Sequence, residues 1–272
     1  MIDIMDVGLN NHLKRISSEL FIKYSGEERR KIDISVNNLI NKLDEYFDDE
    51  IDEPMLFGSY TRDTILPRRF DPNSDIDILI QFNTEDYAKL NPESYRNQLK
   101  KFAKDNYPHS IVAKDHPSVV IELNHIKFDL VPSIFDKGFF YDSIEIPDKD
   151  GGWMETEPDT FGEKLTQVNT KFNSIVKPVI RLIKYWNASH GYPFYSYELE
   201  TAIADMNFRN DNYESGFIHA INELPSYNLP DRAAQKVENL KTNAGRVIEY
   251  LERGDIQKAK NSLGRILPEI YQ

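Results

Sequence analysis

Three aspartates stand where their carboxylates could share metal ions. Asp75 and Asp77 stand at the start of the run Ile76–Phe82, which is mostly apolar and β-branched and therefore predicts a buried strand. Side chains two residues apart on a strand share a face, so these carboxylates point the same way. Asp129 alternates with apolar residues in a second strand-like run, Ile126–Val131. Such oxygen ligands suit Mg²⁺, and two ions can stabilise the attacking and leaving oxygens of a phosphoryl displacement.

A Gly-Ser pair precedes these acids and could bind a phosphate. Gly58 and Ser59 end a short apolar run, and a glycine lets the backbone approach a ligand closely. If a helix begins at Ser59, its free N–H groups and positive dipole end form a phosphate seat. Arg62 would follow in the first turns and could add a charge-assisted bond. A lone Asp-x-Asp or Gly-Ser is usually an ordinary loop or strand edge, so the specific signal is their order.

Two later stretches carry further candidates, each with two interpretations. Lys177, Arg181 and Lys184 are spaced i, i+4 and i+7, so a helix would place them on one face. That row either cradles a triphosphate or forms a solvated basic stripe. Ser196 opens another helical run, where its hydroxyl either contacts a phosphate or caps the helix. Tyr197 either stacks on a base or packs as a core aromatic.

The order of these motifs resembles the DNA polymerase β-like nucleotidyltransferase superfamily, whose pattern is Gly-Ser, then Asp-x-Asp, then a distal Asp. Within it, Gly58-Ser-Tyr-Thr-Arg-Asp-Thr64 is similar to the Gly-Ser-Tyr/Phe-x-Arg-x-Thr of the cGAS/DncV-like nucleotidyltransferases, or CD-NTases. Val179–Asn187 resembles the family's helix with a phosphate-contacting lysine, and Tyr195–Glu200 resembles its Ser-Tyr/Phe-x-Leu-Glu helix start. The resemblance covers about residues 55 to 200.

The resemblance implies a fold and a set of site residues. The expected fold is α+β, with a polymerase β-like nucleotidyltransferase lobe around a mixed sheet, a C-terminal helical lobe, and the active site in the cleft between them. Asp75, Asp77 and Asp129 would be the catalytic acids and the ligands of two Mg²⁺ ions, with Mn²⁺ as an alternative. With Arg62 added from the residues themselves, the nucleotide-binding candidates are Gly58, Ser59, Arg62, Lys184, Ser196 and Tyr197.

The implied activity is template-independent joining of nucleoside triphosphates such as ATP into a cyclic dinucleotide or oligonucleotide second messenger, with release of pyrophosphate. The implied setting is bacterial antiphage defence of the CBASS type, which leaves room for regulatory partner proteins from the same defence system. Two alternatives stay open: a transferase acting on an RNA 3′ end or on a protein, and a catalytically inactive nucleotide-binding regulator.

Composition narrows the class of protein. The net charge of −12 argues against constitutive binding along a nucleic-acid backbone, so no template is expected. No apolar run approaches 18 residues, and the acidic start lacks the basic residues of a secretory signal. The chain has no cysteine, and its six histidines show no metal-type spacing. A cytoplasmic protein is therefore expected.

The elements that must position these residues follow from hydrophobic periodicity and turn residues. Strands are expected to end at 57 and to span 76–82, 111–114, 118–123, 126–131 and a short stretch near 143–146, with a turn at 124–125. Helices are expected over 3–24, 27–48, 92–107, 159–171, 177–190, 196–208, 211–223, 231–252 and 254–268. We predict a catalytic lobe over residues 1–158 and a helical lobe over residues 159–272.

Overall fold

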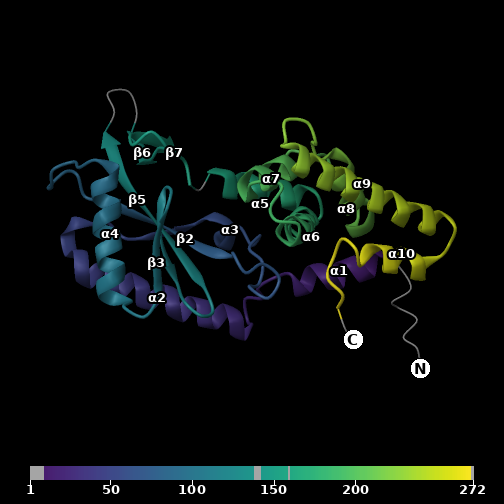
Figure 1. Ribbon diagram of the computed structural model, residues 1–272, viewed down its shortest axis with the longest axis horizontal. Coiled ribbons are helices and arrows are strands. Elements are labelled where there is room, and N and C mark those ends of the chain that lie inside the picture. Colours follow the sequence, from purple (N-terminus) through teal and green to yellow (C-terminus); the bar gives the residue numbers. More distant parts are fainter. Residues whose placement is uncertain (1–8, 138–141, 159, 271–272) are drawn as a thin grey trace. The chain divides into compact units, whose positions relative to one another are not determined.

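The structure, a computed structural model, describes residues 9–137, 142–158 and 160–270, which fall into two compact units (Figure 1). The sheet unit comprises Lys23–Arg68 and Asn73–Glu163. The helical unit comprises the described residues within Met1–Ile22, Arg69–Pro72 and Lys164–Gln272. Each unit has its own buried apolar core.

A mixed sheet forms the centre of the sheet unit. Its path is β1-β2-β5-β4-β3, and β6 and β7 extend it from the far end of β5. The β2 and β5 strands run parallel, while the other pairings are antiparallel. The strands are β1 (Met55–Phe57), β2 (Asp75–Phe82), β3 (Ile111–Asp115), β4 (Ser118–Glu122), β5 (Lys127–Lys137), β6 (Asp142–Pro147) and β7 (Trp153–Thr156).

The alternation of buried and partly exposed residues along β2 shows which face of the sheet is covered. Its even-numbered residues from Ile76 to Phe82 are fully or almost fully buried. The ring of Phe82 lies 4.4 Å from that of Tyr95 on α4 (Pro92–Asn106) and 5.6 Å from that of Phe47 on α2 (Glu27–Phe47). These two helices therefore cover the even-numbered face. The odd-numbered residues, which include both aspartates of β2, belong to the opposite face.

Two short helical turns and one long helix complete the connections of the sheet unit. The 3₁₀ turn η2 (Asp48–Glu50) follows α2, and α3 (Gly58–Thr61) follows β1 directly. The helix α5 (Thr160–Lys171) begins in the sheet unit and continues in the helical unit. The expected hairpin between β4 and β5 is present, with the Leu123 N–H donating to the Ile126 carbonyl at 2.8 Å.

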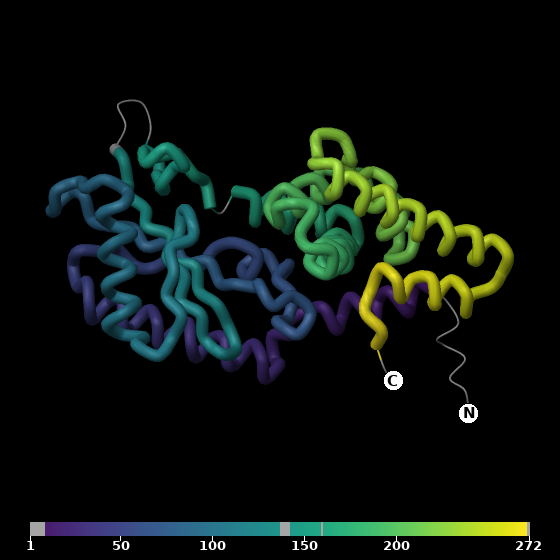
Figure 2. The backbone as a smooth tube through the Cα atoms, viewed as in Figure 1, coloured from purple at the N-terminus to yellow at the C-terminus, as the bar shows by residue number. Residues whose placement is uncertain are grey.

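The helical unit joins segments that are far apart in the sequence. The first described helix, α1 (Leu9–Glu19), contacts α6, α8 and α10, and Figure 2 shows the purple α1 beside the yellow α10. The buried side chains of Leu9, Leu13 and Ile16 on α1 supply this packing. The other helices are α6 (Val176–Ser189), α7 (Ser196–Ala204), α8 (Tyr213–Glu223), α9 (Asp231–Glu252) and α10 (Ile256–Leu263).

The two units differ from the predicted lobes, 1–158 and 159–272, in their boundaries. Residues 9–22 belong with the C-terminal helices because the apolar side of α1 packs against α6 and α8. The division on the C-terminal side falls after Glu163. The sequence also missed β7, a strand of 4 residues that follows two glycines, and overran the ends of α7 and α10. Residues 3–8 and 159 of the predicted helices lie outside the described residues.

Candidate active site

Strand register brings the three predicted acids to one face of the sheet. In the parallel pairing of β2 with β5, Asp75 lies opposite Lys127, and Asp77 lies opposite Asp129. Residues in register on neighbouring strands point to the same side of a sheet. Asp75, Asp77 and Asp129 therefore share the face that α2 and α4 leave uncovered. We call Asp129 the third acid.

Gly58 lies directly against one of these acids. Its φ is +78°, and a Cβ at this position would stand 1.9 Å from Oδ2 of Asp77. No side chain larger than hydrogen fits there, so the sequence requires glycine at this point. Phe57, the preceding residue, is in register with Asp77 across the antiparallel β1–β2 pair, which sets the close approach. The Gly-Ser turn and the Asp-x-Asp strand thus form one local structure.

Ser59 and Arg62 occupy the short helix α3 and its C-terminal end. The carbonyl of Ser59 accepts two backbone hydrogen bonds of 3.0 Å, from Thr64 and Ile65, which fix the turn. Arg62 was predicted to contact a phosphate. In the structure it is buried, and its guanidinium lies 5.2 Å from the centre of the Phe161 ring. The helix starts at Gly58, one residue earlier than Ser59.

A lysine that sequence reasoning missed stands among the acids. The Lys127 Nζ lies 3.1 Å from Oδ2 of Asp75 and 3.5 Å from Oδ1 of Asp129. The longer distance is at the outer limit of a hydrogen bond, so the contact with Asp129 is mainly electrostatic. Lys127 precedes Asp129 by two residues on one strand, and this alternation was a readable signal that both share a face.

The third acid has a hydroxyl donor that was also missed. Ser118, which opens β4 and is buried, donates its Oγ–H toward Oδ2 of Asp129 at 3.1 Å. Its hydroxyl also lies 2.9 Å from the Asp115 carbonyl, so one proton serves two acceptors. No described residue donates a hydrogen bond to the buried Oδ1 of Asp129. Ser118 therefore orients the carboxylate and leaves Oδ1 available as an acceptor.

The environment disfavours the charged form of Asp129. Burial is the largest cause, and the neighbouring charge of Asp75 adds to it; Lys127 and Ser118 offset them only partly, so the pKa of Asp129 rises to about 6. Burial also works against the charged form of Lys127, but the charges of Asp129 and Asp75 outweigh it and raise the pKa of that ammonium. The raised pKa of Asp129 thus comes mainly from burial, and that of Lys127 from the two neighbouring carboxylates.

The residues of this face suit a divalent cation by their chemistry. They offer carboxylate oxygens, which Mg²⁺ prefers, an unused buried acceptor and an excess of negative charge. In the described part of the chain, no three His, Cys, Asp or Glu side chains are grouped closely enough to hold an ion as they stand. The Lys127 ammonium interacts with two of the acids where such an ion would bind them.

The helical unit contains the other predicted contacts. Lys184 is 7% exposed, and its Nζ lies 2.7 Å from Oε1 of Glu200, which is fully buried. Arg181 is buried as well, with its guanidinium 4.8 Å from the centre of the Phe21 ring. The predicted basic row is therefore not a solvated stripe, because these two members are covered. Lys177 on the same helix is half-buried.

Ser196 and Tyr197 form the exposed start of α7. Ser196 is the first residue of the helix, while Tyr195 takes the capping position without a side-chain cap bond. The interpretation of Ser196 as a plain cap is therefore wrong, and its hydroxyl lies in the first turn. Tyr197 is 57% exposed and is not a core aromatic. Its aromatic ring is accessible for stacking.

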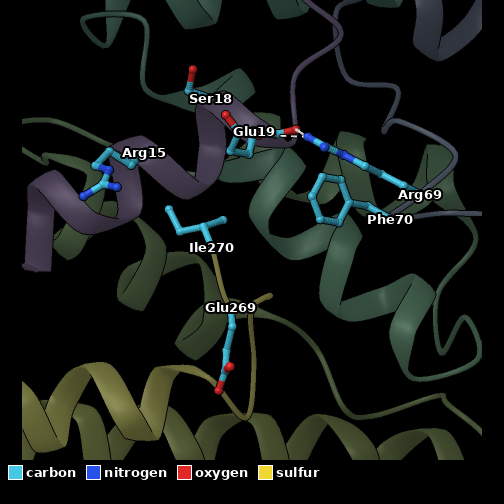
Figure 3. A pocket seen from close by; sticks show the side chains of 7 residues that line it. All are labelled: Arg15, Ser18, Glu19, Arg69, Phe70, Glu269 and Ile270. Carbon is cyan, nitrogen blue, oxygen red and sulfur yellow. Dashed lines mark hydrogen bonds and ion pairs between the residues drawn. The ribbon is translucent and has the colours of Figure 1, made fainter. Parts of the chain in front are cut away.

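A cavity of about 480 Å³ lies elsewhere in the helical unit, between α1, the Arg69–Phe70 segment and the Glu269–Ile270 segment. Figure 3 shows Glu19 and Arg69 joined on its wall by an ion pair of 2.8 Å. None of the predicted site residues lines this cavity. In the described residues, no helix is both long and apolar enough to span a membrane.

Comparison with known proteins decides the family. A family model described as the Second Messenger Oligonucleotide or Dinucleotide Synthetase domain (SMODS) matches residues 7–169. The chain belongs to this family. The matched range contains all three acids and the Gly-Ser turn, and it ends before Lys184. The predicted resemblance to the CD-NTases is confirmed.

Two curated relatives share part of the chain. The "Probable cyclic nucleotide synthase" of Bacillus cereus (strain VD146) is 28% identical over 193 residues, 59% of this chain and 57% of that protein. The "Cyclic AMP-AMP-AMP synthase" of Acinetobacter sp. (strain ATCC 27244 / 9458) is 26% identical over 181 residues, 62% of this chain and 50% of that protein. The chain thus spans about half the length of the curated relatives that it matches.

The fold extends beyond the range of the family model. CdnC of E. coli MS115-1, solved with ATP and in complex with HORMA-deltaN, superposes with a TM-score of 0.68 at 15% identity. The match covers 97% of this chain and 98% of that chain. This likeness confirms the predicted α+β, polymerase β-like fold with its mixed sheet and helical part.

Proposed function

We propose that this protein is a template-independent nucleotidyltransferase that joins nucleoside triphosphates into a cyclic dinucleotide or oligonucleotide and releases pyrophosphate. The observation that carries the proposal is the register of Asp77 with Asp129, with Gly58 in direct contact with Asp77. Membership of the SMODS family and the two relatives named as cyclic nucleotide synthases support the reaction class. We place the reaction in cytoplasmic bacterial antiphage defence of the CBASS type.

Different residues of the chain would bind the metal and the phosphates in this reaction. Asp75, Asp77 and Asp129 would hold Mg²⁺, or Mn²⁺ in its place, and Ser118 would keep the third acid oriented toward the shared face. When bound, the metal would neutralise triphosphate charge and lower the pKa of the attacking hydroxyl. Gly58 and Ser59 would let phosphate oxygens approach the backbone closely. No larger side chain fits at Gly58, so this approach depends on glycine.

The helical unit would supply further nucleotide contacts. Lys184 would reach the triphosphate only by leaving Glu200, so nucleotide binding would exchange one anionic partner for another. Ser196 and Tyr197 are exposed at the start of α7, where a hydroxyl can bond to a phosphate and a ring can stack on a base. We therefore keep all three as nucleotide-binding candidates.

The names of the similar proteins support a proposal for the substrates and partners. CdnC was solved with ATP, and one relative is named for a product made of AMP, so we propose ATP among the substrates. CdnC was also solved in complex with HORMA-deltaN, and we propose that a regulatory protein acts on this chain too. The net charge of −12 disfavours the alternative of a transferase acting on an RNA 3′ end.

A product assay tests the proposal. The purified protein is incubated with Mg²⁺ and the four ribonucleoside triphosphates carrying a labelled α-phosphate, treated with phosphatase, and analysed by chromatography and mass spectrometry. We expect a phosphatase-resistant cyclic product. In a parallel sample without phosphatase, we expect pyrophosphatase to produce free phosphate from the released pyrophosphate. Asp77→Asn should abolish both, while Asp136→Asn, on the same β5 strand as Asp129, should leave both unchanged.

The same assay separates the alternatives. If activity appears only after an RNA or a protein acceptor is added, the protein transfers nucleotides to that acceptor and does not form a cyclic product. Nucleotide binding without any pyrophosphate release, with metal and candidate activating proteins present, would indicate an inactive regulator. Full turnover in Asp77→Asn would refute the assignment of the acids.

A further inference from the structure

Among the described side chains, Lys127 forms ion pairs with two of the three acids. Its Nζ lies 3.1 Å from Asp75 and 3.5 Å from Asp129, and its side chain is only 19% exposed. The two acids are 29% and 16% exposed, so solvent weakens these attractions less than it weakens a surface ion pair. The strand register places Lys127 directly opposite Asp75, so the contact is built into the sheet.

The position of the ammonium conflicts with a divalent ion at the same oxygens. A cation that coordinates Asp75 and Asp129 would meet the positive charge of Lys127 at close range, where like charges repel strongly. Oδ1 of Asp129 receives no hydrogen bond from a described residue, so the ammonium is its charge partner at 3.5 Å. Metal binding must therefore break both Lys127 contacts or distort them.

We propose that Lys127 is a built-in competitor of the divalent cation, which holds Asp75 and Asp129 while the metal is absent and weakens metal binding to the nucleotide-free protein. Lys127 is in this sense a positioning residue. The inference rests on the proposed function, because it takes the three acids as the metal ligands. Three acids without a nearby ammonium would bind divalent ions more tightly. Because of Lys127, the nucleotide-free protein should bind them poorly.

The test measures the affinity of the nucleotide-free protein for Mn²⁺, by following the electron paramagnetic resonance signal of the free ion at low salt. Lys127→Met removes the charge and keeps the length of the stem, so its Kd for Mn²⁺ should fall by at least about tenfold. Lys127→Arg keeps the charge and should bind Mn²⁺ as weakly as the unchanged protein. Lys31→Met is the matched control, since Lys31 forms an exposed ion pair of 2.8 Å with Glu27 on α2.

The outcomes separate this inference from the proposed function. If Asp77→Asn removes Mn²⁺ binding but Lys127→Met binds no more tightly than the unchanged protein, the metal site stands and the competitor role of Lys127 is refuted. If Mn²⁺ binding survives Asp77→Asn, or if no Mn²⁺ binds to any of these proteins, the assignment of the metal site is refuted. The inference about Lys127 is then refuted as well. A merely structural role for Lys127 predicts weaker binding in Lys127→Met, the opposite sign.

A second measurement uses the unchanged protein and does not depend on the folding of a variant. Pulse acetylation followed by peptide mass spectrometry reports how accessible each lysine amine is. Adding Mg²⁺ to saturation should raise the labelling of Lys127 and leave that of Lys31 the same. Equal labelling of Lys127 with and without bound metal would show that the ammonium is not displaced, and would overturn the proposal.

Discussion

At neutral pH Asp129 is ionised in the folded protein, although its surroundings make ionisation less favourable than it is in the unfolded chain. The pKa of this carboxyl is 3.8 in an ordinary setting and rises to about 6 here. Below pH 3.8 the group is protonated in both the folded and the unfolded chain. Between pH 3.8 and 6 the folded protein keeps a proton that the unfolded chain releases, so stability falls as pH rises through this window. Above pH 6 the loss is complete.

The stability lost by ionising Asp129 is the stability that Asp129→Asn is expected to gain. One pKa unit corresponds to about 1.4 kcal/mol, so the full loss is about 3 kcal/mol above pH 6. Asparagine carries no charge and can still accept the Ser118 hydrogen bond. The attraction of Lys127 for the carboxylate and the Ser118 hydrogen bond are already contained in this net shift. We expect metal-free Asp129→Asn to be about 3 kcal/mol more stable at pH 7.5, and less than about 1 kcal/mol more stable at pH 4.

Urea unfolding in EDTA can measure this difference within the sheet unit. The chain has two tryptophans, so in a Trp186→Phe background the fluorescence reports on Trp153 of β7. Asp136→Asn is the control on the same strand; Asp136 forms an exposed ion pair of 3.5 Å with Lys89, and its loss should change stability by less than about 0.5 kcal/mol.

Two results would refute this reasoning. A less stable Asp129→Asn at pH 7.5 would mean that the carboxylate stabilises the metal-free fold. An equal gain at pH 4 and pH 7.5 would mean that packing, and not charge, is the cause. In either case the negative charge of the face would no longer support the proposed metal site.

Three further predictions concern single positions. Gly58→Ala should unfold at least about 2 kcal/mol more easily than Gly151→Ala in calorimetry, since both keep a positive φ but only Gly58 meets a neighbouring carboxylate, at 1.9 Å. Lys184→Met should cost about 3–5 kcal/mol in urea unfolding because it leaves Glu200 buried without its ammonium, and adding Glu200→Met should restore most of that loss. Ser118→Ala should weaken Mn²⁺ binding roughly tenfold because the third acid loses its orienting donor.

Contrary results for these positions would each point to a specific error. If Gly58→Ala and Gly151→Ala lose the same stability, the cost of alanine at a positive φ explains both losses. The close approach of Gly58 to Asp77 would then contribute nothing. A double variant as unstable as Lys184→Met alone would show that the buried charge of Glu200 is not what destabilises. Unchanged Mn²⁺ binding in Ser118→Ala would mean that the hydroxyl does not orient the third acid.

Local pattern predicted most of the elements of the site. Alternation placed Asp75 and Asp77 on one face, and the Gly-Ser turn stood where a strand meets a short helix. The adjacency of Asp77 and Asp129 depends on a parallel pairing of strands about fifty residues apart, which periodicity alone does not define. Only the resemblance to a known family carried that step. Lys127 was readable on its own strand, but its contact with Asp75 follows from the cross-strand register.

Tertiary packing explains the remaining differences. Lys184 looked like an accessible cation on a helical face, whereas a residue sixteen positions later, Glu200, provides a buried partner. Arg62 likewise looked accessible, and Phe161 lies against its guanidinium. The first helix seemed to belong with the strands that follow it, because sequence order was the available guide. Each of these contacts joins residues that no helical or strand period relates.

The packing of α1 against α6 and α8 has a consequence for synthesis on the ribosome. The last residue of α8 is Glu223, about 200 residues after the end of α1. At the usual pace of translation, this delay lasts roughly 10–40 s, during which the apolar side of α1 lacks its native partners. The sheet unit needs no segment beyond Glu163 and can be complete much earlier. The nascent chain therefore carries an uncovered N-terminal helix that a chaperone could shield until the later helices emerge.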